Sequence, residues 1–278
     1  MKNDTISCAD IKRRKYTLNE SYFEKIDTAE KAYILGFIYA DGNIDKQKRA
    51  LAIHLKKDDV FILNFIKKSL NSNQPFMIYD DKYILLKITS KKLCSDLVRA
   101  NIQPNKTYVT KSLPYNGEFF SHFLRGFFDG DGSIWSAKNN PHDYGASFTN
   151  NLYVLTEIKD FLKNKLNINS HIRHEKDEGN NFSCSLKIRG SVQLKTIYDF
   201  LYKDDFFSLK RKKDRFLISI QDAEKTLKTD FKYNGIKDKI KTLYNNSVRV
   251  CDIARILNAN YNSVNMSIVR MKERGEIL

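Results

Sequence analysis

Cysteine is scarce in this sequence and long apolar runs are absent, and these two shortages exclude several classes of protein. The 4 cysteines lie far apart, at positions 8, 94, 184 and 251. Because none forms a Cys-x-x-Cys pair, neither a disulfide framework nor a zinc site is expected. No apolar run approaches the length of a membrane span, and no signal peptide precedes Met1-Lys2-Asn3-Asp4. We therefore expect a soluble, cytoplasmic protein with reduced thiols and no membrane partner.

Acidic residues are also in short supply relative to basic ones. The chain of 278 residues has 48 Lys and Arg against 33 Asp and Glu, a net charge of +15. Such an excess indicates a polyanionic partner, although by itself it does not choose between DNA, RNA and an acidic membrane. The 15 Tyr and 18 Phe indicate that this charge surrounds a real hydrophobic core.

One apolar stretch occurs twice, at residues 32–44 and 122–134. Each copy has the length of a helix and closes on Asp-Gly, a polar residue and Ile. Small residues recur four apart in both copies: Gly36 and Ala40, then Gly126 and Gly130. This spacing places both members of a pair on one helix face. Since glycine within a helix costs about 1 kcal/mol relative to alanine, the pattern predicts a close helix–helix contact.

An aspartate ends each of these two predicted helices. Asp41 and Asp131 fall in the last turn, where the helix dipole is negative and a cation would be preferred. Parallel packing would bring the two carboxylates together, and such a pair either shares a proton or binds a hard divalent cation. An Asp-Gly pair also makes an ordinary helix terminus. Its repetition at matched positions favours metal binding.

Both copies resemble the motif of the LAGLIDADG homing endonucleases. The matching residues are Gly36, Ala40, Asp41 and Gly42, then Gly126, Gly130, Asp131 and Gly132. Tyr39 departs from an acid that the family usually has and that Asp129 keeps, but the family's metal-binding acid is the later one. The resemblance covers most of residues 28–220. It implies a monomeric pseudo-dimer that cuts double-stranded DNA with Mg²⁺, for which Mn²⁺ can substitute.

The elements that follow each motif repeat in the same order. Strands at 51–54 and 146–149 correspond, as do strands at 86–88 and 186–188. We predict an α+β fold, a pseudo-two-fold pair of αββαββα halves that form a DNA-binding β-saddle, with a small all-α helix-turn-helix domain at the C-terminus. The predicted segments are a basic arm at 1–27, halves at 28–113 and 114–226, and a C-terminal module at 227–278. The arm contains Lys12-Arg13-Arg14-Lys15, which either contacts phosphates or is a solvated leader.

Antiparallel sheets of this kind have one face covered by helices and one free for a ligand or for water. Lys87 and Lys187 alternate with Leu and Ile in their strands, and a twisted basic sheet fits the DNA major groove. An ordinary solvated face is the alternative. Beside the paired acids and the net charge, we favour DNA.

Four more site residues are implied by the resemblance. In the family, a lysine near the end of each half lies close to a scissile phosphate, and Lys106 and Lys212 are the best matches. Lys212 belongs to the basic cluster 210–213, so the matching lysine could be a neighbour. His54 and Thr149 occupy positions where the family often has a polar residue that holds water in the active site. His54 fits a base-contacting role equally well.

Beyond Asp230 the sequence changes character. Helices are predicted from Gly235 through Tyr244, over 250–257, and from Tyr261 through Lys272. The apolar spacing resembles a helix-turn-helix module, carried by Ala254, Leu257, Val264 and Ile268. Such a module would turn four polar residues toward DNA: Asn262, Ser263, Asn265 and Arg270. A three-helix cap that packs on the core is the alternative.

These features together predict a site-specific, metal-dependent double-strand DNA endonuclease of the kind carried by mobile elements such as introns. Metal held between Asp41 and Asp131 would activate water and stabilise the leaving oxygen. Lys106 and Lys212 would add positive charge near each transition state. Two alternatives share the fold, an RNA-splicing maturase and a DNA-binding transcriptional regulator that does not cut.

Overall fold

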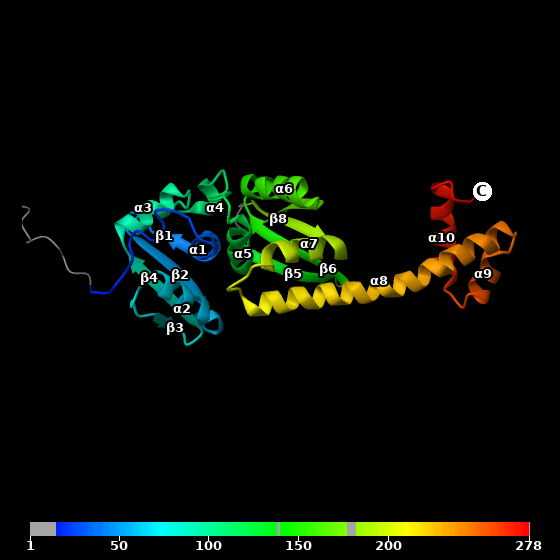
Figure 1. The fold of residues 1–278 in the computed structure, drawn as a ribbon, viewed down its shortest axis with the longest axis horizontal. Coiled ribbons are helices and arrows are strands. Elements are labelled where there is room, and N and C mark those ends of the chain that lie inside the picture. The colour runs from blue at the N-terminus through cyan, green and yellow to red at the C-terminus, as the bar shows by residue number, and fades with distance from the viewer. Residues whose placement is uncertain (1–14, 138–139, 177–181, 278) are drawn as a thin grey trace, which may run out of the picture. The chain divides into compact units, whose positions relative to one another are not determined.

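The computed structural model describes residues 15–137, 140–176 and 182–277, and Figure 1 shows their fold. The chain forms two compact units, Met1–Ile218 and Ser219–Leu278, and each is described by itself below. Of the basic run at 12–15, only Lys15 lies within the described residues. In the part of the chain that the structure describes, no helix is long and apolar enough to cross a membrane.

The first unit contains the same series of elements twice. The first series is α1 (Ala29–Asp41), β1 (Gly42–Ile44), β2 (Ala50–Lys56), the 3₁₀ turn η2 (Lys57–Asp59), α2 (Val60–Ser69), β3 (Met77–Tyr79), β4 (Tyr83–Thr89) and α3 (Lys91–Arg99), followed by the short α4 (Lys106–Val109). The second is α5 (Phe120–Asp131), β5 (Gly132–Ala137), β6 (Asn140–Asn150), α6 (Leu152–Leu166), β7 (Ser170–Lys176), β8 (Phe182–Arg189) and α7 (Ser191–Tyr202). This order confirms the predicted pair of αββαββα halves.

Local sequence signals explain several of these boundaries. Thr28 caps α1 by accepting a hydrogen bond from the backbone N–H of Lys31 at 3.2 Å. Ser90 caps α3 in the same way. Asp80 and Asp81 both have positive φ, 50° and 51°, which is the backbone of the tight primed turns that join hairpin strands. This turn therefore joins β3 and β4 into an antiparallel hairpin.

Each half has one four-stranded antiparallel sheet, with strand orders β1-β2-β4-β3 and β5-β6-β8-β7. The two registers correspond. Gly42 pairs with Ile53 in the first sheet, and Gly132 pairs with Phe148 in the second. The pairs that contain the predicted DNA-facing lysines, Ala52–Lys87 and Ser147–Lys187, correspond too. The sequence match between strands of the two halves is thus confirmed residue by residue.

The motif helices α1 and α5 lie side by side at the centre of the first unit (Figure 1). A Cβ atom on Gly36 would overlap the carbonyl oxygen of Phe123, and one on Gly126 would overlap that of Tyr33. Only glycine therefore allows the two backbones to approach this closely. The predicted seam is present, and its small residues are required at both positions.

The second unit is built from the end of α8 (Lys210–Asn245) with α9 (Val250–Ile256) and α10 (Tyr261–Glu273). Its core unites residues of all three helices and the C-terminal segment: Ile240, Ile253, Ala254, Val264, Ile268, Met271 and Ile277. One sequence expectation is wrong here. No helix begins at Gly235, because that residue lies inside α8.

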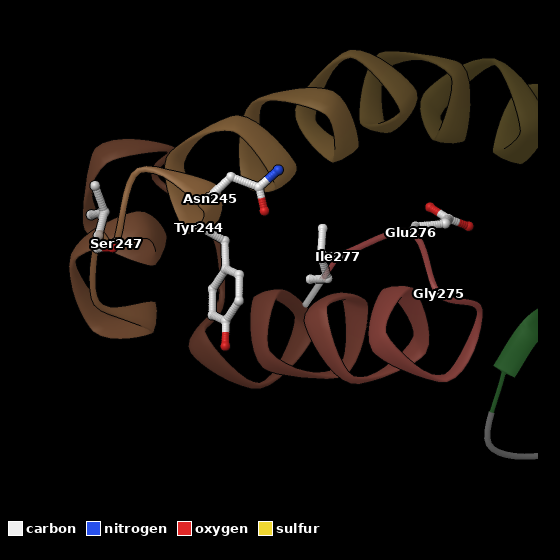
Figure 2. A pocket seen from close by; sticks show the side chains of 7 residues that line it. Tyr244, Asn245, Ser247, Gly275, Glu276 and Ile277 are labelled. Atoms are coloured by element: carbon white, nitrogen blue, oxygen red, sulfur yellow. The ribbon is translucent and has the colours of Figure 1, made fainter.

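The chain segment after α10 is a helix cap. Gly275, with φ +67°, donates its N–H to Lys272 O at 2.9 Å, and Glu276 donates to Met271 O at 2.8 Å. This pair of bonds is a Schellman motif, which closes a helix C-terminus. Figure 2 shows Ile277 in the hollow that it lines with Tyr244 at the end of α8. The hollow contains none of the predicted site residues.

Candidate active site

The two predicted carboxylates meet at one end of the helix seam. Gly126 faces Tyr33, and Gly130 faces Ala40, so the helices run in the same direction. A Cβ atom on Gly130 would lie 3.2 Å from Asp41 Oδ2. The parallel packing thus brings the last turns of α1 and α5, with Asp41 and Asp131, into contact.

Burial makes both carboxylates harder to ionise, and at Asp131 the Asp41 charge adds to this effect. Burial, together with the nearby Asp41 charge, raises the pKa of Asp131 to about 6. The pKa of Asp41 is also raised, chiefly by burial, against the opposing influence of Lys212 and Lys106. Both side chains keep partial solvent access. Carboxylates in this state gain from a nearby cation.

The donor set suits a hard divalent ion that shares its coordination with a substrate. Among the described residues, neither Asp41 nor Asp131 has a hydrogen bond or a salt bridge from a side chain. The described residues also hold no group of three or more His, Cys, Asp or Glu side chains that could enclose an ion. Mg²⁺ is usually held by one or two carboxylates, with water and phosphate oxygens completing its octahedron. Two open carboxylates therefore fit that ion.

The two predicted lysines lie at the C-termini of the motif helices. Lys106 Nζ donates to the carbonyl oxygens of Ile38, at 3.4 Å, and Gly42. A positive charge is favourable at the C-terminus of a helix. Neither α1 nor α5 has a basic residue in its last turn, so each lysine supplies that charge from another segment. Burial lowers the pKa of both Lys106 and Lys212 to about 8, although Asp41 and Asp131 oppose the shift.

The hydrogen bonds of Lys212 limit its role. Its Nζ donates to the carbonyl oxygens of Phe128 at 2.9 Å, Asp129 at 2.7 Å and Gly130 at 2.7 Å. An ammonium group has three N–H donors, so all of them are occupied. Within the described part of the chain, Lys106 has two carbonyl partners, so one of its three donors has no partner there. The two lysines occupy equivalent places but differ in what they can offer a phosphate.

The role of Asp129 as a structural anchor was not predicted from the sequence. Its Oδ2 accepts hydrogen bonds from Tyr33 Oη at 2.8 Å and from the backbone N–H of Leu209 at 2.8 Å. Leu209 immediately precedes α8, so Asp129 fixes the start of the helix that carries Lys212. Burial raises the pKa of Asp129 to about 6, and the two hydrogen bonds oppose the shift. At the matching position of α1, Tyr39 instead donates to Asn150 Oδ1 at 3.2 Å.

A buried arginine completes this anchor. Arg125 donates from Nε to Phe207 O at 3.1 Å and from Nη1 to Leu201 O at 2.9 Å. Its guanidinium lies 5.3 Å from the centre of the Tyr33 ring, and the side chain is fully buried. The sequence signal was a single arginine within the otherwise apolar run 123–128. Such a charge is rarely buried without partners.

The first turn of α8 and the residues just before it also tie the two halves together. Arg211 forms a two-pronged salt bridge with Asp59 of η2, at 3.3 Å and 2.9 Å. Phe207 stacks on Phe65 of α2, with ring centres 3.9 Å apart and planes 9° from parallel. These contacts hold the N-terminal end of α8 against the first half.

The other predicted residues of the first unit lie on the sheets. His54 is exposed on β2, with its ring 5.3 Å from that of Tyr83 and 6.1 Å from that of Tyr79. Thr149 occupies the corresponding position on β6. Lys87 is exposed and Lys187 is half-buried, on the same sheet faces as His54 and Thr149 respectively. The two roles considered for His54 stay open.

The predicted residues of the second unit lie on α10. Asn262, Ser263 and Arg270 are exposed, whereas Asn265 is half-buried. Asn260 caps this helix, since its Oδ1 accepts from the backbone N–H of Asn262 at 2.9 Å and of Ser263 at 3.3 Å. The side chains of the first turn of α10 are therefore open to a ligand.

Comparisons with known proteins agree with this arrangement. Residues 118–201 match the sequence model of a LAGLIDADG-like domain. An uncharacterized protein from Methanocaldococcus jannaschii is 28% identical over 187 residues, which are 65% of this chain and 60% of that relative. The chain thus matches about three fifths of its relative's length.

Solved structures extend the likeness to both LAGLIDADG halves. The LAGLIDADG homing endonuclease I-GzeII, in complex with its DNA target, matches 77% of this chain and 92% of its own, with 14% identity and a TM-score of 0.51. A lysine-to-alanine mutant of the meganuclease I-SmaMI matches 68% of this chain and 90% of its own, with 14% identity and a TM-score of 0.50. At such identities the likeness shows the fold. The chain has the two-half LAGLIDADG fold.

Proposed function

We propose that this protein is a metal-dependent endonuclease that cuts both strands of a specific double-stranded DNA site. The observation that carries the proposal is the convergence of Asp41 and Asp131 at the end of the seam, half-buried and unpaired among the described residues. The net charge of +15 suits a polyanionic substrate. The fold is shared with I-GzeII, whose structure contains a DNA target.

Mg²⁺ is the cofactor that we propose, and Mn²⁺ is expected to substitute. Asp41 and Asp131 would hold it, because hard cations prefer carboxylate oxygens and neither carboxylate forms a salt bridge with a described residue. Once bound, the ion would lower the pKa of water and stabilise charge on the leaving oxygen. Tyr39 is a poor competing nucleophile, because burial and the Asp131 charge raise the pKa of its hydroxyl, which donates to Asn150.

The lysines support this chemistry in different ways. Lys106, with one donor free, can hydrogen-bond a phosphate oxygen as negative charge develops on it. Lys212 acts through its charge, because its three donors are bound to the end of α5. Both lysines also hold the helix ends that present the carboxylates.

The sheets and the C-terminal unit would bind the DNA. Lys87 and Lys187 stand on the sheet faces opposite the buried core, and a two-stranded or wider β-ribbon enters the major groove. In the second unit, the exposed first turn of α10 supports a helix-turn-helix role for Asn262 and Ser263. Since both halves lie in one chain, we propose that a monomer suffices.

A cleavage selection tests the function directly. A randomised duplex library is incubated with the protein in Mg²⁺, and cut ends are sequenced; a parallel binding selection uses Ca²⁺. We expect a defined site cut on both strands. Specific binding in Ca²⁺ without cleavage in Mg²⁺ or Mn²⁺ would favour the regulator. Binding to structured RNA in preference to DNA would favour the maturase.

A further inference from the structure

The two sheets can be compared position by position, because their registers correspond. In each, one face is buried in the core and includes Ile53 and Leu86 in the first sheet and Phe148 and Leu186 in the second. Alternate residues point to the opposite side, which we term the open face. It is the side on which Lys87 and Lys187 stand at equivalent positions.

The open face of the first sheet carries an exposed apolar patch. Met77 pairs with Leu85, and Tyr79 pairs with Tyr83. Met77 is 47% exposed and Tyr83 is 39% exposed, so a ligand can reach them. The strand residues of this face include lysines but no arginine. An exposed apolar patch of this kind marks an interaction surface.

At most equivalent positions, the open face of the second sheet has a polar residue where the first has an apolar one. The strand pairings show which positions are equivalent: Met77 and Arg173, Leu85 and Ser185, Tyr83 and Ser183, Ala52 and Ser147. Thr89 and Arg189 are equivalent too, so a small polar residue of the first sheet is an arginine in the second. Ser147 and Ser185 are short and buried, so the two arginines are the cationic groups that distinguish this face. The lysines at 87 and 187 are common to both faces.

The arginines of the second face are free to bind a ligand. Neither Arg173 nor Arg189 forms a salt bridge with a described residue, and both are exposed. The guanidinium of Arg189 lies 4.7 Å from the centre of the Trp135 ring. That ring occupies the space that Gly145 leaves by lacking a Cβ atom. Stacking of this kind orients the guanidinium before any ligand arrives.

In the major groove these two surfaces recognise different bases. Arginine binds guanine through O6 and N7 with two hydrogen bonds, which is a specific contact for that base. Apolar groups contact the C5-methyl group of thymine. Lys87 and Lys187 are equivalent, so they cannot give the two halves of the protein different base preferences.

Resting on the proposed function, we propose that the two halves of the DNA site differ in base composition. The half that faces the β5–β8 sheet carries guanines bound by Arg173 and Arg189. The half that faces the β1–β4 sheet is rich in A·T pairs, whose thymine methyl groups contact Met77, Tyr83 and Leu85. The apolar patch of the first sheet is therefore a DNA-reading surface.

The first experiment repeats the binding selection in Ca²⁺ with the full-length protein and its variants. The wild type should enrich a site with guanines in one half and A·T pairs in the other. Arg173→Ala and Arg189→Ala should each relax the guanine preference at one position, by about tenfold, and leave the other half unchanged. Leu85→Ser, which installs the residue of the second sheet, should relax the thymine preference in the A·T half alone.

A second experiment uses the wild-type protein, so its main result is independent of how the variants fold. Deoxyuridine replaces thymidine in one half of the enriched site at a time, which removes the methyl groups and keeps every hydrogen bond. Affinity should fall several-fold for the half assigned to the first sheet and stay unchanged for the other. Leu85→Ser should be less sensitive to this replacement than the wild type.

The outcomes separate the two proposals. If no sequence is enriched, the proposed function fails. If a specific site is bound but both halves have the same composition, or deoxyuridine has equal effects in the two halves, the inference fails and the proposed function stands. The inference would also fail if the arginine variants lost their guanine preference in the same half of the site in which Leu85→Ser lost its thymine preference.

Discussion

The two halves of the LAGLIDADG core hold equivalent lysines by different means. Lys106 begins α4, a helix of 4 residues whose N-cap Asn105 has a left-handed backbone. Lys212 stands in the first turn of α8, a helix of 36 residues whose start is hydrogen-bonded to Asp129. The carboxylates and the seam glycines correspond closely. A duplicated fold thus keeps the groups that would act on a substrate, while the contacts that hold them in place differ.

The largest effect is expected at the carboxylates, which the two halves share. Asp41→Asn and Asp131→Asn should each abolish double-strand cleavage, because each removes one of the two negative charges that would hold the cation. Specific binding in Ca²⁺ should persist. Cleavage of a plasmid carrying the selected site measures the effect, and the exposed Asp58→Asn is the control. Full cleavage by either site variant would remove the assignment.

The anchors should differ in their effect on stability. Asp129→Ala leaves the Tyr33 hydroxyl and the Leu209 N–H without their buried acceptor, and each buried donor left unsatisfied costs about 1–3 kcal/mol. Tyr39→Phe removes only one hydrogen bond, to Asn150, which is worth about 1 kcal/mol. Urea unfolding at pH 7.5 measures both free energies. Equal losses would show that the two positions support the core alike.

Substitution of either seam glycine, Gly36 or Gly126, should instead cost a similar amount of stability. Gly36→Leu and Gly126→Leu both force a side chain against a backbone carbonyl of the other helix, and overpacking costs roughly 1–3 kcal/mol or more. Gly235→Ala is the control, because a Cβ there meets no atom within 4 Å. Thermal unfolding compares the three. An unchanged melting temperature in both Leu variants would contradict the close approach of α1 and α5.

Divalent cations should stabilise the protein in a pH-dependent way. The folded pKa of Asp131 is about 6 against an ordinary 3.8, so the folded state binds this proton more tightly than the unfolded state. Without metal, the free energy of unfolding should therefore fall as the pH rises from about 3.8 to above 6. Ca²⁺ at 100 times its dissociation constant adds about 2.7 kcal/mol, and its effect should be smaller at pH 5 than at pH 8, because a proton must first leave. Thermal shifts measured at both pH values test this, with Asp131→Asn removing the dependence.

The smallest effect concerns the C-terminal unit. Truncation after Ala223 removes α9, α10 and more than half of α8, and it should weaken DNA binding while cleavage persists at low salt and high protein concentration. For every phosphate that the shortened protein no longer binds, the salt slope should become shallower by about 0.9. Footprinting should show reduced protection on one flank. A soluble truncated protein with unchanged footprint, affinity and slope would exclude a DNA-binding role for this unit.

The sequence by itself was sufficient to predict the seam, the halves and the strand correspondence. Gly36 and Gly126 are visible in a linear sequence because glycine within a helix is unfavourable and needs a compensating contact. The strand match between Lys87 and Lys187 follows from alternation, which is a local property. The apolar spacing after Val250 likewise predicted α9 and α10. The extent of α8 was not predictable, because Gly235 weakens a helix without ending it.

Only the tertiary structure decided what the polar residues of the site contact. Lys106 and Lys212 were predicted near the scissile phosphates, but their bonds to helix carbonyls depend on segments far apart in the chain. Asp129 was seen in the sequence only as a motif acid, and its bond to Leu209 joins residues 80 apart. Helix periodicity and glycine spacing are short-range, so sequence reveals them. Hydrogen bonds between distant side chains and backbones form only once packing has brought both groups together. For such bonds, the sequence alone predicts neither which group is the partner nor how many donors stay free.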